Sequence, residues 1–281
     1  MGNIGNNAKL SSIESIKQLE GCCEKGSKAQ GLHQLKLYLA RFGYLNYQNT
    51  LDHESTEDEE FDDELEAALK SYQNFFHLNA TGTLDGPTVS QMVIPRCGLP
   101  DRKTYLNGPR SPHIDPHFKL SPQLLRWPPG KTSFTYAFPP NYPKQHIPPV
   151  TRALQNWADS THYFKFSKID DFMKADFKIS FEQRKHGDHN DFDGRGGVVA
   201  HGFPPTYGML HFDIEDSWSE GPGTDPKKLD LMTVAIHEIG HMFGLDHSED
   251  KNAIMFPYIV NGIIKRVAAD DIKGIKTLYK F

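Results

Sequence analysis

The sequence predicts an α+β protein in which a small domain of three helices precedes a larger domain with a mixed β-sheet. Apolar residues recur at helical spacing through residues 31–94. Six prolines then fall within residues 108–130, a density typical of an extended connector. From residue 134 onwards, short runs typical of strands mix with helical patterns in no regular alternation, which favours a mixed sheet.

The composition excludes several classes of protein. The 281 residues contain 31 Lys and Arg against 36 Asp and Glu, a formal charge of −5. This balance argues against a nucleic-acid binder or a protein held on membranes by basic patches. Hydrophobic residues make up 37% of the chain, too many for a disordered protein. No run approaches 18 consecutive apolar residues, so no transmembrane helix is expected.

The first domain is predicted to contain three amphipathic helices. Apolar side chains share one helical face in residues 31–46, with a stop at Gly43, and again in residues 61–76. A shorter helix is expected at residues 87–94. The acidic run from Asp52 to Asp63 is expected to be solvated surface.

The second domain is predicted to contain both strands and helices, and Val150, Leu154 and Trp157 mark its first helical face. The expected strands lie at residues 134–138, 164–167, 175–181, 197–202 and 209–212. The expected helices lie at residues 147–161, 229–243 and 269–281.

The N-terminus and the cysteines bear on the cellular compartment. Residues 1–7 have neither a basic start nor an apolar core, so they do not form a secretory signal. The protein is then either cytosolic or the product of a precursor whose leader has been lost.

Cys22, Cys23 and Cys97 make an odd count, and because neighbouring cysteines rarely bridge each other, no disulfide framework is expected.

The run His-Glu-Ile-Gly-His-Met-Phe-Gly-Leu-Asp-His, starting at His237, has the spacing of metal ligands. Positions i and i+4 of a helix share a face, so His237 and His241 can offer two rings to one cation. Gly244 can take the positive φ that ends a helix, and the resulting turn brings His247 back as a third ligand. Three nitrogen ligands with an open fourth position are what a catalytic zinc requires.

Glu238 lies about 100° around the same helix from His237, beside the predicted metal. A catalytic zinc lowers the pKa of water toward about 7 and polarises the scissile carbonyl. Glu238 is therefore the candidate general base, which takes a proton from the attacking water and passes it to the leaving amine.

Met255, in the run Ala-Ile-Met-Phe-Pro eight residues after His247, completes a pattern that resembles the metzincin metalloproteases. In that family a methionine turn forms an apolar floor under the zinc, and the resemblance implies this role for Met255.

The run Pro-Arg-Cys-Gly-Leu-Pro-Asp at residues 95–101 narrows the resemblance, because it looks like the cysteine switch of the matrix metalloproteinases. A thiolate suits zinc, so Cys97 would fill the fourth position and keep the enzyme latent. By the same resemblance, Arg96 and Asp101 would pair to hold this loop in shape.

The resemblance covers nearly the whole chain and implies three regions. Residues 1–107 would be a helical propeptide similar to peptidoglycan-binding folds, and residues 108–126 a linker that contains the activation site. Residues 127–281 would be a metzincin catalytic domain with a mixed five-stranded sheet and three helices. The absence of a propeller after residue 281 resembles the minimal, plant-type members.

A second group of residues predicts a structural zinc, because three imidazoles and a carboxylate can close a tetrahedral site. The group comprises His186, Asp188, His201 and His211. His189 and Asp191 repeat the spacing of His186 and Asp188, so they remain an alternative pair. Counting back from the Phe-Asp-Gly run at residues 192–194 favours the earlier pair.

Carboxylates and glycine-loop carbonyls interleaved with this group offer the hard oxygen ligands that calcium prefers. By resemblance, the calcium ligands would be the carboxylates of Asp193, Asp213 and Asp216 and the carbonyls of Gly194, Gly196 and Val198. The chain departs from the family pattern at Asp191, where Pro is usual, and at Gly202, where Ala is common.

By family analogy, the strand from Val198 to Gly202 would pair with an extended peptide substrate. The main specificity pocket would lie between the zinc helix and the wall from Pro257 through Tyr258 to Ile259, with Thr233 reaching into it. A pocket with this lining should prefer apolar side chains such as Leu.

The residues and the resemblance together predict a latent zinc endopeptidase. By the resemblance, it would be secreted and monomeric, and would cleave extracellular or cell-wall proteins after an activating protease has cut between residues 104 and 126. Two alternatives belong to other classes. A non-catalytic binding protein with a vestigial zinc site predicts a damaged ligand set or a missing glutamate, and neither is seen. A glycan-binding module at residues 31–94, attached to a hydrolase, predicts binding to cell-wall polymer.

Overall fold

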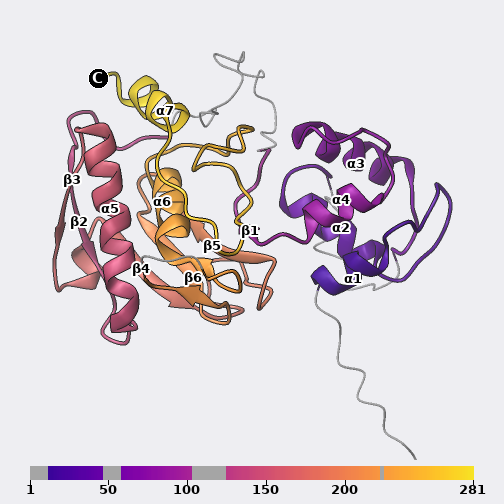
Figure 1. Cartoon of the computed structure of the whole chain (residues 1–281), viewed down its shortest axis with the longest axis horizontal. Helices are drawn as coiled ribbons and strands as arrows, with labels where there is room; N and C mark the ends of the chain where they lie inside the picture. The colour runs from indigo at the N-terminus through magenta and orange to yellow at the C-terminus, as the bar shows by residue number, and fades with distance from the viewer. Residues whose placement is uncertain (1–11, 47–57, 103–124, 222–224) are drawn as a thin grey trace, which may run out of the picture. The chain divides into compact units, whose positions relative to one another are not determined.

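The computed structural model describes residues 12–46, 58–102, 125–221 and 225–281. The chain forms two compact units, residues 1–94 and 95–281 (Figure 1). The first is helical and the second combines a mixed sheet with helices, so the predicted α+β class is confirmed. Most of the predicted linker lies outside the described residues. No helix in the described ranges combines the length and the apolar character that crossing a bilayer requires.

The first unit contains helices near the three predicted positions and one more at its start. The helices are α1 (Ser12–Gln18), α2 (Leu32–Arg41), α3 (Asp63–Phe75) and α4 (Gly86–Met92). Asp62 and Asp85 begin α3 and α4, because their side chains accept the backbone N–H of Leu65 and Thr88. Helix α1, which was not predicted, packs against α2 and α4.

One expectation for this unit was incomplete and another was wrong. The described acidic side chains of residues 58–63 are solvent-accessible as expected, but Asp58 and Asp62 also accept hydrogen bonds from the buried ammonium of Lys36. Residues 52–57 of the run lie outside the described residues. A buried charge needs such partners. Cys22 and Cys23 form a disulfide, although adjacent cysteines rarely do.

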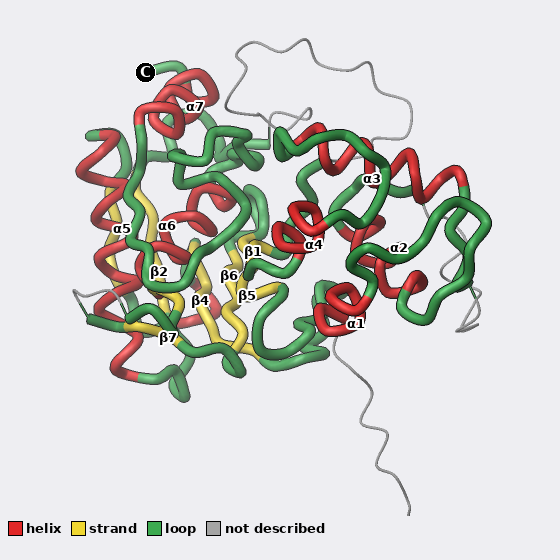
Figure 2. The backbone as a smooth tube through the Cα atoms, turned by 45° about the vertical axis from the view of Figure 1, so that its right-hand side comes forward, coloured by secondary structure: helices red, strands yellow, loops and turns green. Residues whose placement is uncertain are grey.

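The second unit is built on a six-stranded sheet in the order β1-β5-β6-β4-β2-β3. Its strands are β1 (Arg96–Cys97), β2 (Ser133–Ala137), β3 (Lys165–Lys168), β4 (Phe177–Glu182), β5 (Val198–Gly202) and β6 (Met209–Asp213). Only the β5–β6 pair is antiparallel among these neighbours. Five of the strands correspond to the predicted sheet, and β1 is a sixth strand added beside β5, as Figure 2 shows.

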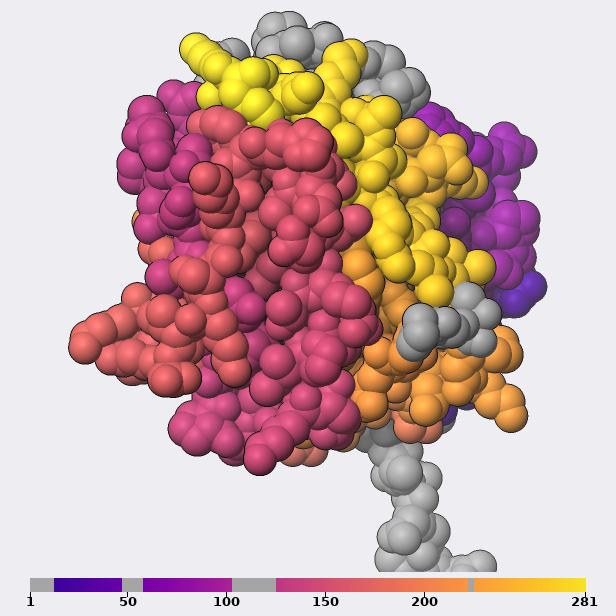
Figure 3. Space-filling model, turned by 60° about the vertical axis from the view of Figure 1, so that its left-hand side comes forward, coloured from indigo at the N-terminus to yellow at the C-terminus, as the bar shows by residue number. Residues whose placement is uncertain are grey.

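Three α-helices accompany the sheet, as predicted. They are α5 (Ile147–Thr161), α6 (Leu231–Met242) and α7 (Ala269–Tyr279), with short 3₁₀ turns at Lys144–His146 and Phe172–Lys174. Helix α6 begins two residues later than predicted because β8 (Leu229–Asp230) pairs with β7 (Trp218–Ser219). Figure 3 shows the face of this unit where the C-terminal segment (yellow) lies beside the α5 region (rose).

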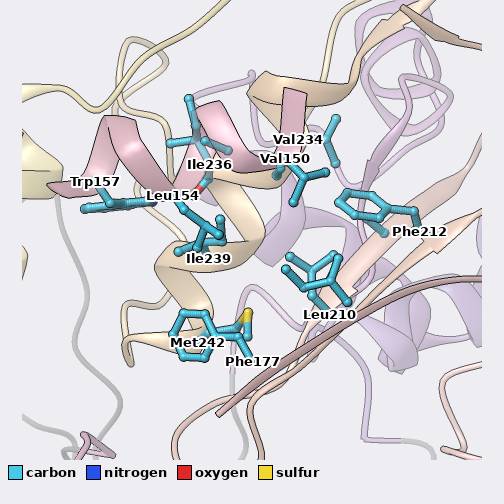
Figure 4. Close-up of a cluster of buried hydrophobic side chains, with 14 of the residues drawn as sticks. Val150, Leu154, Trp157, Phe177, Leu210, Phe212, Val234, Ile236, Ile239 and Met242 are labelled. Carbon is cyan, nitrogen blue, oxygen red and sulfur yellow. Dashed lines mark hydrogen bonds between the residues drawn. The ribbon is translucent and has the colours of Figure 1, made fainter. Parts of the chain in front are cut away.

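The core of the second unit lies between α5, α6 and the sheet. Figure 4 shows its apolar side chains, contributed by α5 (Val150, Leu154, Trp157), α6 (Val234, Ile236, Ile239, Met242) and the strands (Phe177, Leu210, Phe212). The indole N–H of Trp157 donates to the carbonyl of Ile236, which fixes α5 against α6. The helix that carries the predicted zinc ligands is therefore held rigidly on one side by this core.

Candidate active site and metal centres

Helix α6 and the turn after it bring three histidine rings together. His237 and His241 lie one turn apart on α6, and Gly244, with φ of 99°, turns the chain so that His247 returns to them. Ring centroids are 4.8 Å apart for His237 and His241 and 5.3 Å apart for His237 and His247. All three side chains are buried.

Backbone hydrogen bonds orient the rings of His237 and His241 so that one nitrogen of each faces the other. The Nδ1 atoms of His237 and His241 lie 2.7 and 2.8 Å from the carbonyls of Ile254 and Leu245. A carbonyl can only accept, so each Nδ1 carries the proton and each Nε2 presents a lone pair. Those two Nε2 atoms face each other at 3.1 Å.

The sulfur of Cys97 lies at the same point. Cys97 Sγ is 3.5 Å from His241 Nε2 and donates a hydrogen bond of the same length to Glu238 Oε2. One ligand atom each of Cys97, His237, His241 and His247 lies within 4.8 Å of all the others.

These four residues fit a tetrahedral zinc. With Zn–N and Zn–S bonds near 2.0 and 2.3 Å, neighbouring ligand atoms are separated by roughly 3.3–3.6 Å. The distances of 3.1 and 3.5 Å are close to these values. His247 Nε2 is buried without a hydrogen-bond partner, and opposing acceptor nitrogens require a cation between them.

Glu238 lies beside this point, completely buried. Burial raises the pKa of its carboxyl to about 8, although hydrogen bonds from the Cys97 thiol and the Gly202 N–H act to lower it. Its Oε1 atom has no hydrogen-bond partner. Burial, together with the Glu238 charge, also raises the pKa of the Cys97 thiol, so a thiolate at this position needs a cation as its partner.

The segment around Cys97 lies between two walls of the second unit. On one side, the N–H groups of Arg96 and Gly98 donate to the carbonyls of Gly197 and Ala200 at 2.8 Å, and β1 runs parallel to β5. On the other side, Cys97 N–H donates to the Pro257 carbonyl at 3.0 Å. We call residues 95–101 the switch segment.

The predicted pair of Arg96 and Asp101 is present within the switch segment. Arg96 Nη2 donates to Asp101 Oδ1, and both side chains are fully buried. The same Asp101 oxygen lies 2.8 Å from Nδ1 of His247. Burial acts to raise the pKa of Asp101, but the Arg96 guanidinium and the His247 ring outweigh it and hold the pKa at about 2.

The second predicted metal group also converges. Asp188 Oδ2 lies 2.8–2.9 Å from His186 Nε2, His201 Nε2 and His211 Nδ1. His186 Nδ1 donates to the carbonyl of Arg184, which leaves its Nε2 for a metal. The structure brings His186 and Asp188 into this cluster, rather than the alternative pair His189 and Asp191. Three imidazole nitrogens and a carboxylate oxygen that converge in this way supply the donor set of a closed tetrahedral zinc site.

The predicted calcium loop gathers carboxylates next to this cluster. Asp193 accepts the Val198 N–H and Asp216 accepts the Gly196 N–H. One oxygen each of Asp213 and Asp216 is buried without a hydrogen-bond partner. Burial, followed by the charges of Asp213 and Asp193, raises the pKa of Asp216 to about 7. Clustered carboxylates with unpartnered oxygens fit a hard cation such as calcium.

The remaining predicted residues border the histidine cluster. Met255 is buried next to Ile254, whose carbonyl orients His237. The Thr233 hydroxyl donates to Asp230 and accepts the backbone N–H of Lys265, so it ties the chain after the methionine turn to α6. Tyr258 is buried, with its ring centroid 4.9 Å from the Arg96 guanidinium carbon.

Two features of the site could not be read from the sequence. The switch segment joins the sheet as β1, and Asp101 binds His247 across a separation of 146 residues. The one signal in the sequence for the second feature was the carboxylate of Asp101 at the end of the switch pattern, and the resemblance paired that carboxylate with Arg96 alone.

Comparisons with known proteins agree with this geometry. A family model described as matrixin matches residues 126–280, and one described as a putative peptidoglycan binding domain matches residues 28–92. Metalloendoproteinase 5-MMP of Arabidopsis thaliana is 38% identical over 97% of this chain and 77% of its own length. Metalloendoproteinase 1 of Glycine max is 36% identical over 90% of this chain and 83% of its own. Macrophage metalloelastase of Oryctolagus cuniculus is 40% identical over 76% of this chain and 44% of its own.

Proposed function

The chain belongs to the matrixin family and is a zinc metalloendopeptidase, and from that premise we propose that it is a latent precursor whose switch segment blocks its own catalytic centre. The observation that carries the proposal is the convergence of the Cys97 sulfur and three histidine rings beside Glu238. The proposal has three parts, which concern catalysis, latency and the supporting metals.

His237, His241 and His247 would hold the catalytic zinc, since their Nε2 atoms converge in a buried site. When bound, zinc acts as a Lewis acid on the scissile carbonyl and lowers the pKa of water. Glu238 takes the proton of the attacking water and returns it to the leaving amine. Its position supports this role, because the carboxylate lies beside the point where the ligand atoms converge and is not itself one of the converging ligands.

Latency follows from the position of the sulfur. Cys97 lies where a fourth zinc ligand belongs, and its thiol also contacts Glu238. The switch segment uses backbone groups of β5 and of Pro257, which are the groups that an extended substrate would need. Substrate and water are therefore excluded together until an activating protease cuts between residues 104 and 126 and the propeptide leaves.

The supporting metals would hold the loop before β5. A structural zinc would bind the cluster around Asp188, and calcium would bind Asp193, Asp213 and Asp216 with carbonyls of the intervening loop. The buried, unpartnered oxygens of Asp213 and Asp216 support the calcium site.

We further propose that the substrate is an extracellular or cell-wall protein, cleaved beside an apolar side chain that enters between α6 and the wall Pro257–Ile259. The Cys22–Cys23 disulfide supports an oxidising compartment. We expect the active enzyme to be monomeric.

The test measures metal content and peptide hydrolysis on the full chain and on the chain cut between residues 104 and 126. The zinc-loaded full chain should be inactive and the cut chain active on casein or an apolar peptide library. A zinc chelator should abolish this activity and added zinc should restore it. A cut, fully zinc-loaded protein that hydrolyses no polypeptide would overturn the proposal.

A further inference from the structure

The three histidines of the cluster differ in what holds their outer nitrogens. His237 and His241 donate through Nδ1 to the carbonyls of Ile254 and Leu245, which are backbone groups of the catalytic part of the chain. His247 Nδ1 instead faces a side chain of the switch segment, the Asp101 carboxylate, at 2.8 Å. Both side chains are fully buried, so water does not compete for this contact.

The contact has the form of a carboxylate–histidine–metal arrangement. An ionised carboxylate can only accept, so Nδ1 of His247 carries the proton and its Nε2, which has no hydrogen-bond partner, points its lone pair into the cluster. A carboxylate on the outer nitrogen fixes the tautomer and orientation of the ring and makes the ring a stronger ligand. Arg96 donates to the same Asp101 oxygen and so holds that carboxylate in place.

We propose that Asp101 is a positioning residue for zinc: through His247 it strengthens metal binding in the latent protein, so that release of the switch segment weakens zinc binding in addition to opening the fourth position. This inference rests on the proposed function. It assigns the switch segment two contributions to the metal site, the Cys97 sulfur directly and the Asp101 carboxylate through His247.

The rival interpretation is that Asp101 serves only to hold Arg96 and the shape of the switch segment. Under that interpretation, loss of the carboxylate would change how readily the segment leaves, but not the properties of His247. The experiment must therefore measure zinc affinity and the state of the His247 ring, and not the loss of latency.

The test uses the full chain with Cys97 in place, because the sulfur keeps the switch segment, and with it Asp101, at the histidine cluster. Asp101→Ala and Asp101→Asn are introduced into this chain, and zinc affinity is measured by competition with a chromophoric chelator. The absorption of the Co²⁺–thiolate bond checks that the sulfur stays bound in each variant. Asp101→Ala should weaken binding at the histidine site by about 10–100-fold, and Asp101→Asn, which keeps an acceptor without the charge, by less.

Two controls accompany the measurement. Asp176→Asn removes a partly buried carboxylate that binds Lys131 and Thr135, and it should leave both zinc affinities within about twofold. The Asp188 cluster is the internal control, because its zinc affinity should be the same in all variants.

A second readout follows the His247 ring itself. With Co²⁺ bound at the histidine site, the exchangeable Nδ1 protons of His237, His241 and His247 give shifted proton resonances. Asp101→Asn should move the His247 resonance and leave the other two. If Asp101→Ala does not fold, the resonance measurement on Asp101→Asn tests the proposal by itself.

The outcomes separate this inference from the proposed function. The role of Asp101 would be overturned if the Asp101 variants bound stoichiometric zinc at the histidine site with the affinity of their parent. It would also be overturned if Asp101→Asn left the Nδ1 resonances unchanged. Either result would leave the proposed protease function intact. Failure of the full chain to bind any metal beyond the Asp188 cluster would overturn both.

Discussion

At the scale of single residues, the proposed mechanism assigns metal binding and proton transfer to different side chains, the three histidines and Glu238. Glu238→Gln should keep the zinc content, since the glutamate is not among the converging ligands, and should lower kcat/KM of the cut enzyme by about 10²–10⁴-fold because the general base is lost. Metal analysis and peptide hydrolysis on the same sample check both statements. Activity close to the parent value would mean that another group takes the proton.

In the proposed function, latency depends on the Cys97 sulfur. In the uncut chain, Cys97→Ser replaces a soft ligand by a weak one, so the fourth position should open and the protein should hydrolyse peptide without cleavage. Gel analysis must show that the chain is still intact when activity is measured. A silent, intact and zinc-loaded Cys97→Ser chain would mean that the switch segment blocks the site by its backbone pairing rather than by its sulfur.

The sequence could predict the histidine cluster because its geometry is local. His237 and His241 share a helical face, and Gly244 marks the turn, so spacing alone determines their approach. The contact of Asp101 with His247 is not local, since the pattern at residues 95–101 carries no information about which distant ring it meets. The buried Lys36 was missed for the same reason, because its acidic partners lie more than 20 residues away.

At the scale of secondary structure, strand β5 and helix α6 approach each other closely at Gly202. A Cβ at this position would lie 2.4 Å from the carbonyl oxygen of Glu238. Gly202→Ala must therefore push the strand away from the helix and weaken the Gly202 N–H bond to the Glu238 carboxylate.

We expect Gly202→Ala to cost about 1–3 kcal/mol of stability and to lower kcat/KM of the cut enzyme. Urea unfolding and peptide hydrolysis measure the two effects. Gly221→Ala is the matched control, because nothing lies within 4 Å of the added methyl group, and it should change stability by less than about 0.5 kcal/mol. Equal behaviour of the two variants would show that the strand adjusts without cost.

Asp176 joins the residues before β4 to β2, since it accepts hydrogen bonds from Thr135 and from Lys131. Burial acts to raise its pKa, but these donors outweigh burial and lower the pKa below 3.8. An acid with a lowered pKa stabilises the fold above its unfolded pKa of about 3.9, and this contribution is lost as pH falls through the folded value.

Asp176→Asn should therefore destabilise the protein by about 1–2 kcal/mol at pH 7, a value reduced by the partial exposure of Lys131. The difference between parent and variant should shrink as pH falls below 4. Urea unfolding of both proteins across pH 3–7 measures it. A difference that is constant with pH would assign the effect to packing rather than to charge.

Helices and strands were predictable where the spacing of their own apolar residues determines them. They were less predictable where pairing with a neighbouring strand determines them. The apolar face of α5 predicted its bounds correctly because Val150, Leu154 and Trp157 fall at helical spacing. Strand β1 has two residues and becomes a strand only because β5 lies beside it, so no periodicity could reveal it. The start of α6 shifted for a similar reason, since Leu229 and Asp230 pair with β7.

At the scale of the whole molecule, the contact boundary between the two units falls at residues 94 and 95, so the switch segment packs with the unit that carries the histidines. The matrixin model begins at residue 126, well after this boundary. The segment that would keep the enzyme latent therefore belongs structurally to the catalytic unit, and its pairing with β5 is part of that unit's sheet. In the proposed function, loss of the switch segment after cleavage would remove an edge strand and leave the edge of β5 open to pair with a substrate.

The proposed calcium site links the stability of this unit to its metal supply. Adding calcium to the dialysed protein at fixed zinc should raise its Tm, because calcium binds the native carboxylates and offsets the repulsion among Asp193, Asp213 and Asp216. At about 100 times Kd, binding contributes about 2.7 kcal/mol. For a domain of this size each kcal/mol moves Tm by about 2–4 °C, so a rise of about 5–10 °C is expected.

Magnesium at the same concentration should raise Tm much less than calcium does, since magnesium demands a stricter octahedral geometry. Asp216→Asn should reduce the calcium response while leaving the zinc content unchanged, and equal Tm values with and without calcium would contradict the site.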